Sequence, residues 1–138
     1  MTETALLLDT CAFIYIVAEA KLSKELQFAL KQAASFDSIF VSPITAWEIG
    51  KLAARGRLQF TTETAKLFQE FVARPGIKLC ELSPEILINS SFLPDLAHKD
   101  PMDQILIATA RSLNIPLVTN DRAILAYGKL GHVKTLAC

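Results

Sequence analysis

Short apolar runs alternate with longer amphipathic stretches along the whole chain. Apolar runs of strand length, bounded by polar or turn-forming residues, predict strands at residues 5–8, 38–42, 77–82, 115–119 and 133–136. Apolar positions at helical spacing between these runs predict helices at residues 11–18, 23–34, 43–55, 61–73, 101–113 and 121–127, and a short helix that begins at residues 83–85. Strands that alternate with helices favour an α/β fold, in which a parallel sheet is covered by helices on both faces.

The predicted helices begin with a recurring local signal. Ser42-Pro43, Ser83-Pro84 and Asp100-Pro101 each place a capping side chain directly before a proline at the first helical position. Ser23 is expected to cap the second helix, and Thr10 the first. These signals fix where the predicted helices start along the chain.

The segment HKDPMDQILIATA, residues 98–110, combines two acids with a strongly apolar helix. Asp100 is placed to cap this helix, and Asp103 falls in its first turn. The residues that follow leave almost no polar face, so we expect the helix to be buried nearly all round. The simplest interpretation gives both acids only a favourable interaction with the helix dipole. A chemical role for Asp103 depends on other acids lying nearby.

The helix that starts at Pro43 carries an acid on its apolar stripe. Trp47 and Glu48 lie three and four residues after Ile44, and Lys51 lies four residues after Trp47 and three after Glu48, so these residues share one side of the helix. Glu48 is therefore expected to point inward, and Trp47 is expected in the core rather than as a surface on which bases stack. The alternative is a glutamate at the edge of the stripe that pairs with Lys51.

Composition limits the class of protein. The 138 residues suffice for one domain with a real core, which we expect to span residues 1–138. Hydrophobic residues make up 51% of the chain, yet they form no run long enough to cross a bilayer, and the first residues do not resemble a secretory signal. A cytoplasmic protein without membrane contact is expected. The formal net charge is zero, so nucleic-acid binding would require a local basic patch.

The cysteines give no sign of a metal site or a disulfide framework. Cys11, Cys80 and Cys138 are odd in number and far apart, which is typical of reduced thiols in a cytosolic protein. Cys11 lies close to Asp9, but no signature connects it to a histidine. We therefore expect Cys11 to be a small buried packing residue rather than a nucleophile.

Four acids are expected to meet at one edge of the sheet. Asp9 ends the first predicted strand and Asp121 follows the fourth, so both belong to the edge where parallel strands end and ligands bind. Asp103 and Glu48 could face the same edge. Taken singly, Asp9 could be a turn residue and Asp121 a helix cap. Carboxylates crowded together become favourable around Mg²⁺ or Mn²⁺, and such a site suits hydrolysis of a phosphodiester.

Four segments, LLLDT, SPITAWEIGKLAARGRL, HKDPMDQILIATA and VTNDRAI, together resemble the PIN-domain ribonucleases, in particular the VapC-like toxins of bacterial toxin–antitoxin modules. The resemblance covers nearly the whole chain, with its motifs in the order of the family. It implies a three-layer α/β/α sandwich with a central, mainly parallel sheet. It also implies an endoribonuclease that depends on Mg²⁺ or Mn²⁺, forms a homodimer and is inhibited by a cognate antitoxin protein.

The resemblance also assigns roles to individual residues. The acids that would act in catalysis and hold the metal are Asp9, Glu48, Asp103 and Asp121. Asp100 matches the family pattern as well, and we place it in a supporting role as the helix cap. Further candidates to orient acids or bound water are Thr10, Thr119 and Asn120. The sequence departs from the family in one place, because DPMDQ stands where DPFDR is usual and a positive charge is lost.

An RNA substrate would also have to be held. The densest basic group in the chain lies on and beyond the helix of Glu48 and consists of Lys51, Arg55 and Arg57. We hypothesise that these residues contact phosphates. The alternative is a solvated helix end, where cations are favourable near the negative end of the dipole.

Two other functions compete with the ribonuclease hypothesis. Asp9 could accept a phosphoryl group, as the aspartate after the first strand does in receiver and phosphatase domains. That hypothesis lacks a paired acid at the strand and gives Glu48 no role. The chain could also be a binding module without catalysis, whose acids receive basic residues of a protein partner.

Overall fold

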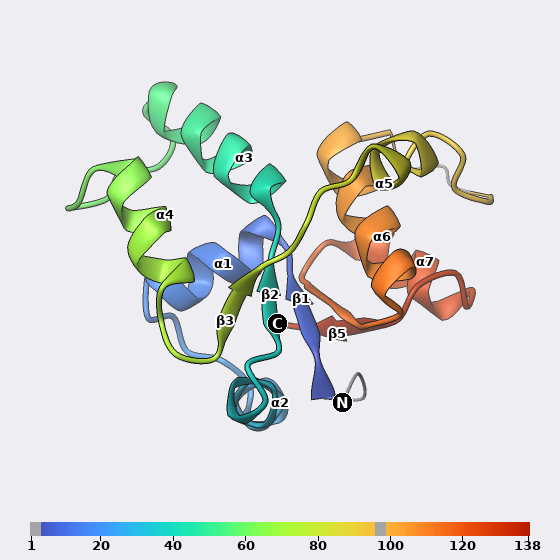
Figure 1. Ribbon diagram of the computed structural model, residues 1–138, viewed down its shortest axis with the longest axis horizontal. Coiled ribbons are helices and arrows are strands. Elements are labelled where there is room, and N and C mark those ends of the chain that lie inside the picture. Colours follow the sequence, from blue (N-terminus) through green and yellow to red (C-terminus); the bar gives the residue numbers. More distant parts are fainter. Residues whose placement is uncertain (1–3, 96–98) are drawn as a thin grey trace.

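A parallel sheet forms the centre of the molecule in the computed structural model, which describes residues 4–95 and 99–138 (Figure 1). In these residues the strands are β1 (Leu6–Leu8), β2 (Ile39–Val41), β3 (Ile77–Leu79), β4 (Leu117–Thr119) and β5 (Thr135–Ala137). They lie in the order β3-β2-β1-β4-β5 and every neighbouring pair is parallel. The predicted parallel sheet is therefore confirmed.

The central strand sets the register of both halves of the sheet. Leu7 of β1 lies opposite Phe40 on one side and Leu117 on the other. All the strands run in the same direction, so their carboxyl ends meet at one edge. The residues that directly follow β1 and β4 are therefore brought to the same edge, although they are far apart in the sequence.

The helices lie close to their predicted positions. They are α1 (Thr10–Val17), α2 (Lys24–Ser35), α3 (Pro43–Ala54), α4 (Thr64–Val72), α5 (Pro84–Asn89), α6 (Pro101–Leu113) and α7 (Arg122–Lys129). The side chains of Ser42, Ser83 and Asp100 accept backbone N–H groups before a proline, as predicted. One cap was predicted wrongly: Thr10 is the first residue of α1, and Asp9 caps it.

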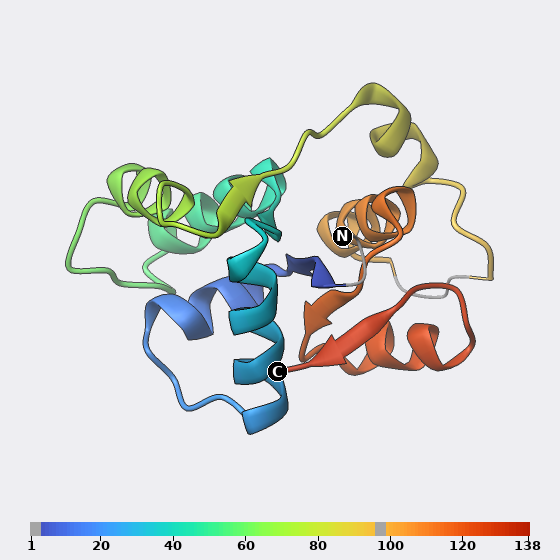
Figure 2. The same ribbon diagram turned by 60° about the horizontal axis from the view of Figure 1, so that its bottom comes forward.

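Within the described residues, the core consists of two hydrophobic clusters, one on each face of the sheet. Leu7 packs with Leu106 and Ile107 of α6, whereas Leu6 and Leu8 belong to the other cluster, which includes residues of α1, α2 and α4. Alternate residues of a strand face opposite sides of the sheet, which explains the division. In Figures 1 and 2, α6 and α7 gather on one side of the molecule, and α1 and α2 on the other.

Burial in the helices partly follows the prediction. Residues 106–110 of α6 are buried without interruption, so this part of the helix is enclosed all round, as expected. Three predictions were wrong: Trp47 is 53% exposed, Cys11 is exposed, and Ala65 is exposed although the apolar spacing of residues 61–73 predicts that it faces inward. Periodicity identifies the side of a helix that carries apolar residues, but not how far the neighbouring element extends to cover it.

Three further predictions concern the cysteines, the loop before α6 and contact with a membrane. The three cysteine thiols are free, as expected. His98, the first residue of the HKDPMDQILIATA segment, and part of the predicted loop at residues 92–99 lie outside the described residues. Among residues 4–95 and 99–138, no helix has both the length and the apolar character needed to cross a membrane.

Candidate active site

Asp9 stands at the centre of the carboxyl edge of the sheet. It directly follows the central strand β1, and its backbone N–H donates to the carbonyl of Val118 in β4. Its Oδ1 accepts the backbone N–H of Ala12 at 2.7 Å, which caps α1. Only 4% of the residue is exposed. The fold therefore holds a carboxylate in a fixed orientation at a buried position.

The environment of Asp9 disfavours its charge. Burial raises the pKa of this carboxyl from 3.8 to about 6. Hydrogen bonds from the side chain of Thr119 and the backbone of Ala12 oppose that rise in pKa, while the charges of Glu48 and Asp121 add to it. Acids from three separate parts of the chain therefore act on one another here.

A hydrogen bond from Thr10, the first residue of α1, connects Glu48 to this edge. Thr10 donates its Oγ1–H to Oε1 of Glu48 at 2.5 Å, and the Thr10 and Thr45 hydroxyl oxygens lie 3.4 Å apart. Within the described part of the chain Glu48 forms no ion pair with Lys51, whose ammonium lies over the ring of Trp47 instead. Glu48 therefore points inward as predicted, and it is half-buried.

Thr45 is a residue that sequence reasoning missed. It is fully buried, and its hydroxyl lies beside the Thr10 group that donates to Glu48. The signal was available, because a threonine three residues before a glutamate shares its side of a helix. The predicted apolar stripe drew attention to Ile44 and away from this polar neighbour.

The two acids at the start of α6 differ in their surroundings. Asp100 is exposed, and its Oδ1 accepts the backbone N–H groups of Met102 at 2.9 Å and Asp103 at 3.3 Å. Asp100 is thus the helix cap, as predicted. Asp103 lies in the first turn of the helix and is half-buried.

Asp121 and its neighbours complete the edge on the side of β4. Its Oδ1 accepts the backbone N–H of Ile124 at 3.0 Å and caps α7, and its own N–H donates to Oγ1 of Thr119 at 3.0 Å. The Thr119 hydroxyl thus connects Asp9 and Asp121. Asn120 donates to the Tyr15 hydroxyl at 3.5 Å, which is a long hydrogen bond.

The charges of all four acids act on one thiol, that of Cys11. Partial burial of the Cys11 thiol raises its pKa, and the charges of Asp9, Glu48, Asp103 and Asp121 raise it further. Coulomb interactions act over several ångströms, so all four carboxylates lie within electrostatic reach of this thiol. The acids that the sequence singles out therefore belong to one region of the molecule.

A divalent cation suits the chemistry of this set of ligands. Carboxylate oxygens are the ligands that Mg²⁺ and Mn²⁺ prefer, and a cation would offset the burial and repulsion that disfavour the charge of Asp9. As the side chains stand in residues 4–95 and 99–138, no three His, Cys, Asp or Glu residues are placed to hold one ion jointly. One oxygen of Asp9 and one of Asp121 accept a helix N–H group.

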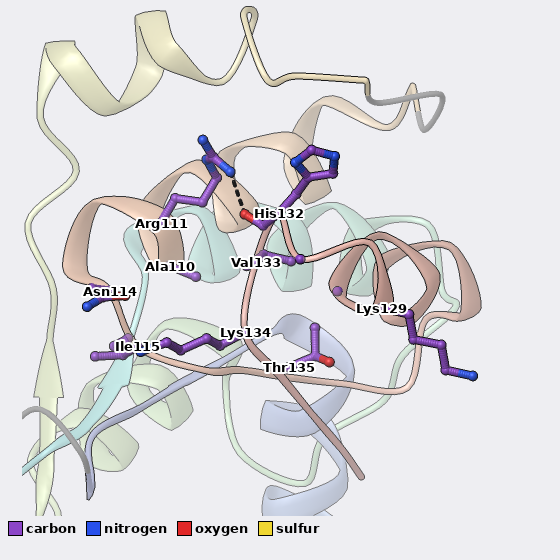
Figure 3. A pocket seen from close by; sticks show the side chains of 11 residues that line it. Ala110, Arg111, Asn114, Ile115, Lys129, His132, Val133, Lys134 and Thr135 are labelled. Atoms are coloured by element: carbon purple, nitrogen blue, oxygen red, sulfur yellow. Dashed lines mark hydrogen bonds between the residues drawn. The ribbon is translucent and has the colours of Figure 1, made fainter.

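A cavity of about 600 Å³ lies at the other edge of the sheet, where β4 and β5 begin. Its lining includes Arg111, Lys129 and Lys134, and Figure 3 shows these three side chains extending in different directions. The Arg111 guanidinium donates to the backbone carbonyl of His132. The His132 ring stacks on Tyr127 with ring centres 4.7 Å apart.

Comparison with known proteins assigns the family. The family model described as PIN domain matches residues 6–130. The chain belongs to the PIN-domain family. A search of curated protein sequences gives no match. The predicted family resemblance is therefore confirmed by the family model rather than by a close relative.

Solved structures share the PIN-domain fold of this chain at low sequence identity. A chain in the structure of VapBC2 from Rickettsia felis, bound to a DNA fragment from its promoter, has a TM-score of 0.70 and 15% identity. The match covers 96% of this chain and 98% of that one. A chain of DNA-bound VapBC from Salmonella typhimurium gives a TM-score of 0.68 and 16% identity, with coverage of 96% and 97%.

Proposed function

We propose that this PIN-domain protein is a metal-dependent endoribonuclease that acts as the toxin of a toxin–antitoxin module. The convergence of Asp9, Glu48, Asp103 and Asp121 at the carboxyl edge of the sheet carries the proposal. The family assignment and the likeness of the fold to chains of VapBC complexes support it. A cognate antitoxin and a homodimer are part of the same proposal.

In this proposal the four acids form the metal site, and two threonines orient them. Asp9, Glu48, Asp103 and Asp121 would hold Mg²⁺ or Mn²⁺ after their side chains move closer together, and the bound ion would lower the pKa of water and neutralise charge on the phosphate. Thr10 keeps Glu48 oriented through the 2.5 Å hydrogen bond, and Thr119 orients Asp9 and Asp121. The residues of the RNA-binding surface are Lys51, Arg55 and Arg57, of which both arginines are exposed.

The structure disfavours one competing function. Phosphorylation of Asp9 would require its carboxylate to attack an incoming phosphoryl group, yet only 4% of the residue is exposed and one oxygen caps α1. The hypothesis of a binding module without catalysis makes no use of the hydroxyl network that orients Glu48 and Asp9. Both alternatives are decided by an activity measurement.

The test is cleavage of labelled RNA by purified protein free of any antitoxin. We expect cleavage with Mg²⁺ or Mn²⁺ and none with EDTA. Asp103→Asn should lower kcat by at least about 10²-fold, as the removal of one charge-stabilising group in an active site does. Asp100→Asn is the matched control: it lies three residues away, and asparagine caps a helix as well as aspartate. Its activity should stay close to that of the wild type.

Several outcomes would contradict the proposal. Cleavage that survives EDTA, or that survives both Asp9→Asn and Asp103→Asn, would exclude the metal mechanism. Phosphorylation of Asp9 by a small phosphodonor would favour phosphoryl transfer. Metal binding without turnover of any RNA would favour a binding module.

A further inference from the structure

Trp47 is an exposed aromatic residue directly beside an acid of the candidate site. It precedes Glu48 in α3, and 53% of its surface is open to solvent. Tryptophan is mostly buried in folded proteins, so exposure of this extent calls for an explanation. Ile44, one turn earlier, is buried in the cluster that includes Leu106 and Ile107 of α6. Figure 1 shows α3 diverging from α6 beyond this start.

A cation holds the indole ring from one side. The Lys51 ammonium lies 4.7 Å from the centre of the Trp47 ring. A cation over the face of an aromatic ring is attracted to it and restricts the orientation of the ring. The ring therefore has a defined position, and its surface open to solvent can receive a planar group.

The residues that follow on the same side of α3 are basic. Trp47, Lys51 and Arg55 succeed one another at steps of four residues, which places them in one row along the helix. Arg55 is exposed at the end of the helix. An aromatic ring followed by two cations matches the alternation of base and phosphate in a single strand of nucleic acid. An apolar protein surface would be matched less well by a ring flanked by cations.

We propose that Trp47 is a stacking platform for an unpaired nucleobase next to the phosphodiester that is cleaved, and that Lys51 and Arg55 contact the adjoining phosphates. This inference rests on the proposed ribonuclease function and adds to it a requirement for a single-stranded substrate. A base in a duplex already stacks on its neighbours and cannot lie on the indole ring.

The first experiment measures steady-state cleavage of a short unstructured RNA. Trp47→Ala should raise KM about 5- to 150-fold, the range that stacking of one base on an aromatic ring gives, with little change in kcat. Trp47→Phe should restore most of the affinity because it keeps an aromatic face. Phe28→Ala removes a 64% exposed aromatic residue from α2 and is the control, expected to leave KM unchanged.

The second experiment uses the fact that Trp47 is the sole tryptophan of the chain. Its fluorescence is followed in the Asp103→Asn variant with EDTA, so that nothing is cleaved. A short oligouridylate should quench the emission, whereas inorganic tripolyphosphate and a perfect RNA duplex should not. This measurement does not depend on activity, and it also covers the case in which Trp47→Ala fails to fold.

The outcomes separate this inference from the function on which it rests. RNA cleavage with an unchanged KM for Trp47→Ala and no quenching would overturn the stacking role alone. Quenching by tripolyphosphate as strong as by oligouridylate would also overturn it. If Trp47→Ala weakened only the binding of a protein inhibitor, the exposed ring would be a protein-binding residue and the inference would be wrong. Quenching by oligouridylate in the Asp103→Asn variant, together with no RNA cleavage by the wild-type protein with Mg²⁺ or Mn²⁺, would support stacking and contradict the nuclease proposal.

Discussion

At the carboxyl edge of the sheet the charges of four acidic side chains all act on the Cys11 thiol, whereas at the amino edge three basic side chains line a cavity and extend in different directions. The cavity of about 600 Å³ lies at the amino edge, while the buried carboxyl with a raised pKa lies at the carboxyl edge. In this fold the volume of a cavity is therefore a poor guide to chemistry. Topology gathers the ends of parallel strands, and the residues directly after those ends acquire functional roles.

The two edges should also differ in their effect on stability. At the amino edge the close approach of α7 to β5 at Gly128 stabilises the fold, while the buried carboxylate at the carboxyl edge costs stability in its charged form. Residues placed for function commonly reduce stability in this way. Three substitutions test whether this contrast holds.

Asp9→Asn should give the largest effect. The pKa of Asp9 is about 6 when folded and 3.8 for an ordinary aspartate, so the unfolded chain releases its proton first as pH rises. The wild type therefore loses up to about 3 kcal/mol of stability between pH 4 and pH 6 through this group. Asparagine keeps the acceptor for Ala12 and carries no charge. We expect the variant to be more stable at pH 8, as measured by urea unfolding in EDTA.

The part of the stability difference that comes from the charge of Asp9 should disappear only near pH 3 and below, where the carboxyl is protonated in both the folded and the unfolded state. Asp100→Asn is again the control, because that acid is exposed. If Asp9→Asn were less stable than the wild type at pH 8, the carboxylate would be stabilising and the contrast between the edges would be broken.

Thr10→Val should have the next largest effect, which is a loss of catalytic activity rather than a change in stability. It removes the hydroxyl that donates to Glu48 and keeps a side chain of similar shape. Loss of an orienting hydrogen bond behind a metal ligand typically lowers activity about 10- to 100-fold. Thr10→Ser retains the hydroxyl and should restore most of kcat. Equal activity in the valine and serine variants would show that the hydrogen bond to Glu48 has no catalytic role.

Gly128→Ala should have the smallest effect, at the amino edge. A Cβ at this position of α7 would lie 2.8 Å from both γ atoms of Thr135 and 3.2 Å from the carbonyl of Val133. Rotation of the Thr135 side chain cannot move both γ atoms away, so α7 must shift from β5. We expect a loss of about 1 kcal/mol in thermal unfolding. The cleavage rate of the folded protein should be unchanged, and a large loss of kcat would mean that the two edges are coupled.

The sequence is sufficient to predict most of the fold because its local signals agree with one another. A cap followed by proline marks the starts of α3, α5 and α6, and apolar runs mark the strands. The four acids whose charges act on the Cys11 thiol could be chosen because each follows a strand or occupies a first helical turn or an inward stripe. Their roles in catalysis and metal binding stay predictions.

The errors have a common physical cause. Trp47 was expected in the core because it shares a stripe with Ile44, but α6 covers only the start of that stripe. Cys11 was expected to be buried for a similar reason. The cap of α1 was assigned to Thr10 because a strand-ending aspartate was not recognised as a cap. How far one element extends over another is a property of tertiary packing that periodicity does not contain.

Because β1 is the central strand, its two neighbours in the sheet become available at very different times during synthesis. Its neighbour β2 is synthesised soon after it, but its other neighbour β4 is synthesised far later. Asp9 and Glu48 are therefore complete on the ribosome long before Asp103 and Asp121. A nascent chain that ends before α6 has only Asp9 and Glu48, and one that ends before β4 still lacks Asp121. The toxic activity proposed for this protein would thus be withheld from unfinished chains by the strand order itself.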